Sequence, residues 1–508
     1  MVSTIKSYSI QGLEAQTIIV ECDMANGLPS MSIVGTSNRT ADGIKERVRA
    51  AILNSGLDFP RKRITINLAP AGEALDGSLY DLPIALAILT RSGQIKAESL
   101  DQYWVVGELG LDGTTRPVRG ILGMATSVRD SRKSLLAPME NSSQLSLVAN
   151  CEHYLVKSLR DAYEFLNGLS PSKQYRRLHD PIIQQPPEVD FSDIIGQQQA
   201  KRALEIAAAG HHNVLMTGPP GTGKSMLAKA LVGILPPLEI EEQIVISQIH
   251  SLIAASFEKR IETRPFRSPH HSASHISIVG GGQNPRPGEI SLSHGGVLFM
   301  DEIPEFSKQA LEALRQPMED RTIHVSRASR SVSFPSDFIL VATMNPCPCG
   351  FYGDPVKTCN CTSQEILRYQ KKLSGPILDR IDLHIRVERL PSNFLTPTAA
   401  NKSDTSAAIQ RRVEKARSLQ KVRFVERHQT NASMSSAYIR KNSILDQEVI
   451  DLLDQASDRL QLSTRGYFRT IRVARTIADI EGAEKVSVTH MTEAMQYRIL
   501  PSFSTVSA

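Results

Sequence analysis

The most constraining feature of this 508-residue chain is a glycine-rich loop between a short apolar strand and a helix. The run NVLMT (213–217) is followed at once by GPPGTGKS and then by the helical pattern MLAKALVGIL. Such a loop turns backbone N–H groups inward around phosphate oxygens, and the helix N-terminus adds positive potential. A Gly/Pro turn without a ligand is the alternative. The residues expected to bind nucleotide are Gly218, Pro219, Pro220, Gly221, Thr222, Gly223, Lys224 and Ser225.

Within this loop, we expect Lys224 to neutralise the β- and γ-phosphates of ATP and Ser225 to ligate Mg²⁺. Further along the chain, the apolar run VLFM (297–300) ends in Asp301 and Glu302. Four consecutive apolar residues suit a strand buried in a parallel sheet. Asp301 can then hold the water shell of Mg²⁺, and Glu302 can polarise the attacking water. The alternative is a core strand that ends in two solvated acids.

A third apolar run, at 338–344, ends in a lone polar residue, Asn345. An amide there can orient the attacking water or contact the γ-phosphate, although a turn-forming asparagine has the same appearance. The ordered set of loop, acidic strand and asparagine resembles the AAA+ ATPases. In that family Glu302 fits the catalytic glutamate and Asn345 fits the sensor 1 residue.

Longer motifs narrow the resemblance. The chain is similar to the magnesium-chelatase-like branch of AAA+ proteins, and within it to the bacterial YifB/ComM family. The motifs extend over nearly the whole chain. They are RPFRSPHHS (264–272), PGEISLSH (287–294), LRQPME (314–319), NPCPCG (345–350), GLP (27–29), RVRAAI (47–52), NLAPA (67–71) and YDLPIA (80–85).

The family resemblance implies roles for several arginines. SGPILDRID (374–382) looks like an arginine-finger segment, so Arg380 would neutralise charge on the γ-phosphate of a neighbouring subunit's ATP. A surface salt bridge is the alternative. STRGYFRTIR (463–472) resembles the sensor 2 helix of the lid, with Arg465 as the first candidate and Arg472 as the second. An arginine that acts in trans implies a ring, expected to be a homo-hexamer.

At roughly 150 residues per domain, the length suggests about three domains. The pattern and the resemblance together predict a Lon-protease-like (ChlI-type) α/β domain, a proline-rich linker, an AAA+ P-loop α/β core with a parallel sheet, and a C-terminal α-helical lid. In the first domain, strands are expected at 17–22, 63–68 and 104–107 and helices at 40–54 and 81–90. The four divisions lie at 1–168, 169–190, 191–392 and 393–508.

The N-terminal block resembles the Lon protease domain, whose activity needs a serine nucleophile and a lysine. The stretch that would hold the serine reads DGSLYDLP (76–83), in which Ser78 is the nearby candidate and Asp81 follows. Leu122 stands where the lysine would be. Without that amine no base activates a hydroxyl. We therefore predict a non-proteolytic domain that serves assembly or nucleic-acid contact.

Four of the six cysteines are crowded into one short loop, as Cys347, Cys349, Cys359 and Cys361. Four thiolates suit a tetrahedral structural Zn²⁺ site. Each pair is separated by one residue, however, where zinc sites usually have two to four. Reduced free thiols, disulfides or another metal are therefore alternatives.

Positive charge gathers in a segment that is predicted to form a β-hairpin just before the Asn345 strand. The magnesium-chelatase-like branch shares such a hairpin with MCM replicative helicases, in which it projects into the ring pore. The resemblance therefore implies that Arg327 and Arg330 contact DNA phosphates. A solvated hairpin tip is the alternative. The net charge of +5 is too small to demand a nucleic-acid partner, and 5% aromatic residues argue against a protein built on base stacking.

The resemblance implies a ring-forming motor that uses ATP and Mg²⁺ to translocate on single- and double-stranded DNA. Helicase or branch-migration activity would promote homologous recombination of incoming single-stranded DNA in natural transformation, alongside recombination proteins. No apolar run reaches the roughly 20 residues that span a bilayer, so we expect a cytoplasmic protein without membrane contact. The alternatives are a magnesium-chelatase-type remodelling ATPase and a Lon-like ATP-dependent protease.

Overall fold

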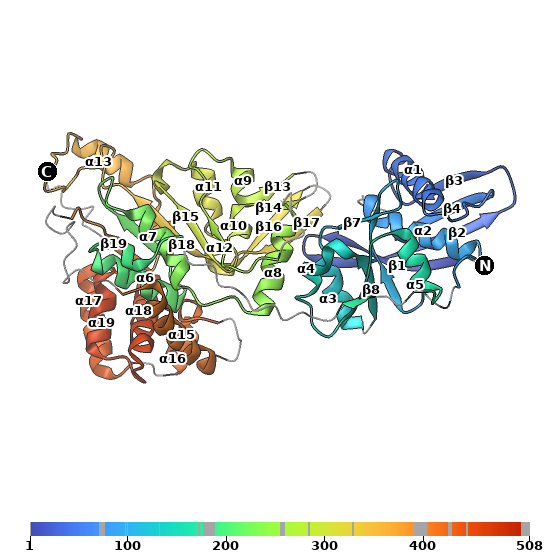
Figure 1. The fold of residues 1–508 in the computed structure, drawn as a ribbon. Helices are drawn as coiled ribbons and strands as arrows, with labels where there is room; N and C mark the ends of the chain where they lie inside the picture. Colours follow the sequence, from blue (N-terminus) through green and yellow to red (C-terminus); the bar gives the residue numbers. More distant parts are fainter. Residues whose placement is uncertain are drawn as a thin grey trace. The chain divides into compact units, whose positions relative to one another are not determined.

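The computed structural model describes residues 2–70, 77–96, 98, 100–131, 133–170, 173–175, 188–253, 260–282, 285–327, 330–390, 404–424, 429–442 and 445–498. The chain forms two compact units (Figure 1). Unit 1 comprises Met1–Ile182 and Glu239–Glu262, and unit 2 comprises Ile183–Leu238 and Thr263–Ala508. Most of the predicted linker, at 171–172 and 176–187, lies outside the described residues.

Unit 1 is built on an eight-stranded mixed sheet of order β10-β9-β8-β5-β1-β2-β4-β3. The strands expected at 17–22 and 63–68 lie within β2 and β4, and the strand expected at 104–107 overlaps the end of β5, which confirms an α/β domain here. The strands are β1 (Ser3–Gln11), β2 (Glu14–Ala25), β3 (Ser30–Val34), β4 (Arg63–Ala69), β5 (Tyr103–Val105), β8 (Ser134–Pro138), β9 (Glu152–Val156) and β10 (Lys173–Tyr175), with a separate pair β6 (Glu108–Leu109) and β7 (Thr115–Arg116).

The helices of unit 1 pack their apolar faces against this sheet. The stripe of Ile44, Val48, Ala51 and Ile52 on α1 is fully buried, as its 3.6-residue spacing predicts. Helix α2 is buried along nearly its whole length, which also agrees with the sequence. The helices are α1 (Asn38–Asn54), α2 (Asp81–Arg91), α3 (Ile121–Ser131), α4 (Ser142–Leu145) and α5 (Leu159–Leu166).

The residues that were compared above with the catalytic residues of a Lon protease are buried or half-buried in unit 1. Leu122 is fully buried in α3, within an apolar cluster. Asp81 is also buried, and its carboxylate accepts hydrogen bonds from Arg47 Nε and Nη2 at 2.6 and 3.0 Å. Burial raises the pKa of Asp81 to about 6, while the Arg47 charge acts in the opposite direction. Ser78 is half-buried in a short 3₁₀ turn.

Helix α8 (Ile240–Ser251) follows the phosphate loop in sequence but belongs to unit 1. It packs against α3, and Ile244 contacts the apolar cluster that contains Leu122. The segment expected to form the ATPase core, 191–392, includes α8, whereas in the structure α8 belongs to unit 1. The physical reason is that α8 packs against α3, a contact between segments far apart in sequence.

Unit 2 contains a five-stranded parallel sheet of order β12-β15-β18-β11-β19, as expected for a P-loop α/β core. Its strands are β11 (Val214–Thr217), β12 (Phe266–Arg267), β15 (Val297–Met300), β18 (Ile339–Met344) and β19 (Leu383–Arg386), with two-stranded pairs β13 (Gly280–Gly281) and β14 (Arg286–Pro287), and β16 (Thr322–Arg327) and β17 (Arg330–Pro335). The helices of this core are α6 (Gln198–Gly210), α7 (Lys224–Ala230), α9 (His275–Val279), α10 (Glu289–Leu292), α11 (Lys308–Ala313), α12 (Pro317–Asp320), α13 (Ser363–Gln370) and α14 (Gly375–Leu378).

The C-terminal segment is helical, as predicted, and α18 packs against α6, α15 and α19 (Figure 1). Its buried side chains share one apolar core with the parallel sheet, so sheet and helices form a single compact unit. No helix in the described part of the chain has the length and apolarity to cross a membrane. These helices are α15 (Ser406–Arg423), α16 (Ser436–Lys441), α17 (Gln447–Leu460), α18 (Thr464–Glu481) and α19 (Val488–Gln496).

Candidate nucleotide site

The glycine-rich loop connects β11 to α7, whose first residue is Lys224. Gly221 and Gly223 have φ angles of +77° and +87°, which glycine adopts without the steric conflict of a side chain. At Gly218 a Cβ atom would lie 2.1 Å from the carbonyl oxygen of Val387. The backbone path of the loop therefore requires these glycines, and the predicted strand–loop–helix arrangement is present.

Lys224 lies beneath the loop with only 8% of its surface exposed. Its Nζ donates hydrogen bonds to the carbonyl oxygens of Gly218 and Pro219 at 2.6 and 2.8 Å, and to Asn345 Oδ1 at 3.3 Å. Burial lowers the pKa of Lys224 to about 8, although the nearby carboxylates of Asp301 and Glu302 favour its charged form. The structure thus brings the loop lysine and the predicted strand-end asparagine together.

The acidic pair lies at the end of β15, close to the start of α7. Ser225 Oγ donates to Asp301 Oδ2 at 3.3 Å. Hydroxyl and carboxylate oxygens are the hard ligands that Mg²⁺ prefers, so this donor set fits an ATP-bound Mg²⁺. Glu302 has a left-handed backbone with φ of +50° and an exposed side chain, and is therefore accessible to a water molecule.

Thr343 connects the two acidic residues and was not singled out in the sequence. Its hydroxyl donates to Asp301 Oδ1 and accepts the backbone N–H of Glu302 at 3.0 Å. The residue is fully buried in β18. The sequence signal that could have identified Thr343 is a hydroxyl residue inside an otherwise apolar strand, two residues before Asn345. Thr343 orients the carboxylate of Asp301 and the backbone of Glu302 with one side chain.

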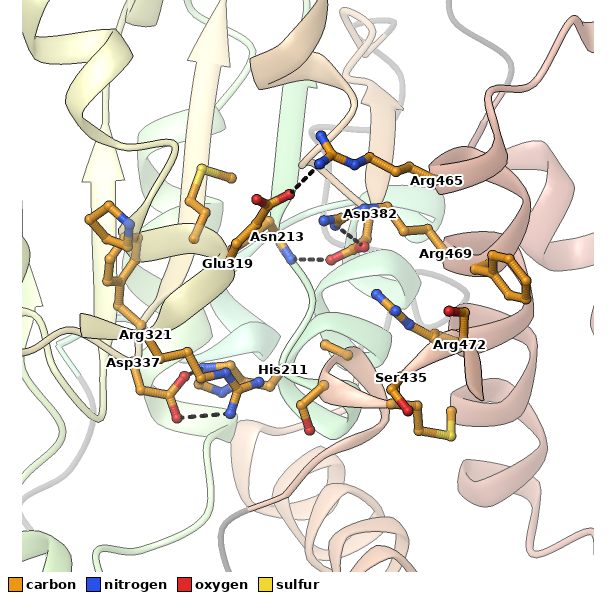
Figure 2. Close-up of a pocket in the computed structure, with 18 of the residues that line it drawn as sticks. His211, Asn213, Glu319, Arg321, Asp337, Asp382, Ser435, Arg465, Arg469 and Arg472 are labelled. Carbon is orange, nitrogen blue, oxygen red and sulfur yellow. Dashed lines mark hydrogen bonds and ion pairs between the residues drawn. The ribbon is translucent and has the colours of Figure 1, made fainter. Parts of the chain in front are cut away.

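A second polar region surrounds Glu319, where unit 2 has a cavity of about 400 Å³ (Figure 2). Glu319 accepts Arg380 Nη2 at 2.9 Å and Arg465 Nη2 at 3.3 Å. The structure thus brings together the predicted finger and sensor 2 arginines, through a glutamate that sequence reasoning did not single out. The cavity lining includes Glu319, Arg321, Asp382 and three arginines of α18, Arg465, Arg469 and Arg472, which we call the lid arginines.

The lid arginines differ in their partners. Arg469 Nη1 donates to Asp382 Oδ1 at 2.6 Å. Arg472 Nε is buried without a hydrogen-bond partner among the described residues, and burial lowers the pKa of Arg472. The cavity therefore contains a guanidinium whose charge is only partly compensated.

This cavity and the glycine-rich loop lie at opposite edges of the parallel sheet. Asn213, Phe338 and Asp382 line the cavity and directly precede β11, β18 and β19. Gly218 and Asn345 directly follow β11 and β18. The four residues of β11 extend over about 13 Å at roughly 3.3 Å per residue. The structure does not bring the lid arginines to the phosphate loop of the same chain.

The predicted hairpin is formed by β16 and β17. Its register pairs Arg327 with Arg330 as the last cross-strand pair before the tip, and Ile323, Val325 and Phe334 anchor its base in the protein interior. The tip residues 328–329 and the side chains of both arginines lie outside the described part of the structure. The backbone arrangement agrees with the predicted hairpin.

The four clustered cysteines lie at the carboxyl edge of the sheet, in the loop that follows β18. Their Sγ atoms all lie within 4.8 Å of one another. All four cysteines are free, with sulfur–sulfur separations of 3.3 Å or more, so the disulfide alternative is absent from this structure.

Comparison with protein-family models gives three matches in different parts of the chain. The model described as magnesium chelatase, subunit ChlI, matches residues 190–395. The model for subunit ChlI of Mg-chelatase matches 20–141, and the model for the C-terminal part of that subunit matches 403–498.

Three relatives cover different shares of the chain. YifB of Salmonella typhimurium is 43% identical over 490 residues, which are 96% of this chain and 95% of YifB. Competence protein ComM of Haemophilus influenzae is 41% identical over 503 residues, 97% of each chain. Lon protease 2 of Bacillus subtilis is 28% identical over 160 residues, 30% of this chain and 29% of the protease.

We predict that affinity for ATP falls as the pH rises above about 8, because Lys224 then loses its proton in the free protein while bound phosphates favour its charged form. The apparent Kd should increase about tenfold between pH 7 and pH 9. A fluorescent ATP analogue measures this dependence. Lys224→Arg is the matched control because arginine stays protonated in this range. The same pH dependence in Lys224→Arg would contradict the assignment.

We also predict that Thr343→Val lowers kcat for ATP hydrolysis about 10- to 100-fold, with little change in ATP affinity. Valine has nearly the same shape but neither donates to Asp301 nor accepts the Glu302 N–H. Thr343→Ser keeps both hydrogen bonds and should retain most of the activity. Steady-state turnover and ATP-analogue binding provide the two measurements, and wild-type turnover in Thr343→Val would exclude an orienting role.

Proposed function

Because the chain belongs to the YifB/ComM family of magnesium-chelatase-like AAA+ ATPases, we propose that it is a ring-forming motor that uses ATP hydrolysis to move along DNA. In this proposal the glycine-rich loop binds ATP, and Ser225 and Asp301 hold Mg²⁺. Glu302 polarises the attacking water, and Asn345 orients it. Helicase or branch-migration activity then promotes homologous recombination of incoming single-stranded DNA in natural transformation.

The observation that carries the DNA part of the proposal is the register of the β16–β17 hairpin. Arg327 and Arg330 form the last cross-strand pair of the hairpin, so the backbone carries two arginines at its end. Two neighbouring cationic residues are suited to contacts with the phosphates of a polyanion. The name of a relative, Competence protein ComM, agrees with a role in competence.

The ring part of the proposal is supported by the two edges of the parallel sheet. Arg380 and the lid arginines lie at the amino edge, whereas the phosphates of a bound ATP belong at the carboxyl edge. We propose that Arg380 and Arg465 act on the ATP of a neighbouring subunit, with Arg472 as the second lid candidate. Glu319 then pairs with both arginines while no γ-phosphate is within their reach. A closed hexamer repeats this contact around the ring.

Two other functions have weaker support. A magnesium-chelatase-type remodelling ATPase agrees with the names of the matching family models, and stimulation of ATP hydrolysis by single-stranded DNA would separate it from a DNA motor. An ATP-dependent protease agrees with the partial similarity to Lon protease 2. A buried leucine at 122 provides no base, however, and degradation of casein would test this function directly.

We predict that the wild-type protein moves a labelled three-strand DNA junction in the presence of ATP and Mg²⁺, whereas Lys224→Ala leaves it unmoved. The double variant Arg327→Ala/Arg330→Ala should bind DNA more weakly, with a reduced salt dependence. Arg160→Ala removes an exposed arginine of unit 1 and should behave like wild type. A wild-type protein that hydrolyses ATP but leaves the junction unmoved would refute the motor assignment.

A mixing experiment tests whether the arginines act between subunits. Arg380→Ala and Lys224→Ala should each hydrolyse ATP poorly when assayed alone. Mixed rings place the intact Arg380 of one variant beside the intact loop of the other, so an equal mixture should regain roughly a quarter of wild-type turnover. An equal mixture of Arg465→Ala and Lys224→Ala should regain turnover to a similar extent. If Arg380 acts within its own chain, mixing will restore nothing.

A further inference from the structure

The four sulfurs of the cysteine loop surround a space for one ion. Cys347 Sγ lies 3.3 Å from Cys349 Sγ and 3.6 Å from Cys359 Sγ, and the latter two are 3.6 Å apart. A tetrahedral Zn²⁺ with Zn–S bonds of about 2.3 Å separates its sulfurs by about 3.8 Å. Cys361 completes the set within 4.8 Å. An iron–sulfur cluster needs room for several atoms between its cysteines, so this spacing favours a single ion.

The loop backbone also stabilises the negative charge of thiolates. The N–H of Tyr352 donates to Cys347 Sγ at 3.3 Å, and the N–H of Cys361 donates to Cys359 Sγ at 3.4 Å. Such N–H···S contacts fix the orientation of thiolate ligands around a metal. Cys347 is fully buried, which protects that side of the site from solvent. Soft, tetrahedral S₄ coordination selects Zn²⁺ over Mg²⁺.

The cysteine loop touches the nucleotide site at two points. Asn345, which accepts a hydrogen bond from Lys224, lies two residues before Cys347. Gly350, with φ of +84°, lies so close to the phosphate loop that a Cβ atom would be 2.8 Å from Pro220 Cδ. A rigid cysteine loop therefore fixes both the strand-end amide and one wall of the phosphate loop.

The second cysteine pair connects this loop to α13. Cys361 is followed by Thr362, which forms a capping box with Glu365 at the helix start. From the same helix, Gln370 Nε2 donates to the carbonyl oxygen of Pro346 at 3.0 Å. One ion held by both pairs closes a loop between the end of β18 and the start of α13, which removes conformational freedom from its 15 residues 347–361.

We propose that Cys347, Cys349, Cys359 and Cys361 bind one Zn²⁺ per chain and that this ion holds Asn345 and Pro220 in place for ATP hydrolysis. The metal has a structural role and takes no part in the chemical step, because all four of its ligands come from protein. The second half of the proposal rests on the proposed ATPase activity, whereas the first half does not.

The first experiment measures metal content in full-length protein purified without chelators or added metal. Elemental mass spectrometry should find about one zinc ion per chain in the wild-type protein. Cys361→Ser should lose most of it, and Cys151→Ser, which removes a half-buried cysteine of unit 1, should keep it. Zinc near zero with four readily titrated thiols, iron in place of zinc, or unchanged zinc in Cys361→Ser would each overturn the metal site.

The second experiment measures the effect on hydrolysis. Cys361→Ser should lower kcat about 10- to 100-fold through loss of positioning, while Cys151→Ser leaves it unchanged. Gly350→Ala provides an independent variant, because its methyl group disturbs Pro220 without removing a ligand. It should retain one zinc per chain yet hydrolyse ATP more slowly.

The outcomes separate the two proposals. Wild-type turnover in both Cys361→Ser and Gly350→Ala would overturn the coupling between the metal and the nucleotide site. A wild-type protein that contains zinc but hydrolyses no ATP under any condition would refute the proposed function and leave the metal site standing.

Discussion

The parallel alignment of five strands is the constraint on which the rest of unit 2 depends. Because all strands run in the same direction, every strand-end residue collects at one edge and every strand-start residue at the other. The glycine-rich loop, Asp301 and Asn345 are neighbours for this reason, although long segments separate them in sequence. The same alignment gathers Asn213, Asp382 and the lid arginines at the opposite edge. One sheet therefore has two chemically distinct edges, one suited to phosphate and Mg²⁺ and one rich in arginine.

Buried hydrogen bonds connect the strand starts to one another at the arginine-rich edge. The N–H of Asn213 donates to Asp382, its side-chain oxygen accepts the N–H of Leu340, and its side-chain nitrogen donates to the carbonyl oxygen of Arg380. Burial would raise the pKa of Asp382, but the charge of Arg469 holds it well below its ordinary value. Together with the contact between Arg469 and Asp382, this network connects α18 to the starts of β11, β18 and β19.

Sequence patterns predicted much of this arrangement because the relevant signals are local. Gly221 and Gly223 reveal the loop through their backbone requirements, and the apolar run before Asp301 reveals its strand through burial. The role of Thr343 was not visible, because a buried hydroxyl becomes functional only when another strand brings Asp301 beside it. The same holds for Glu319, whose two arginine partners come from distant segments. The roles of Thr343 and Glu319 therefore follow from contacts between distant segments, which sequence patterns do not reveal.

The assignment of α8 to unit 1 has a consequence for how the chain can be divided. The backbone passes between the two units at three places, near 182, 238 and 262, instead of through one tether. A fragment that begins after the proline-rich segment would retain α8 but lose α3, leaving the apolar side of α8 without its cover. A fragment that ends before residue 190 would expose the matching face of α3. The two units are thus separate as compact bodies, but no single cut in the sequence separates them.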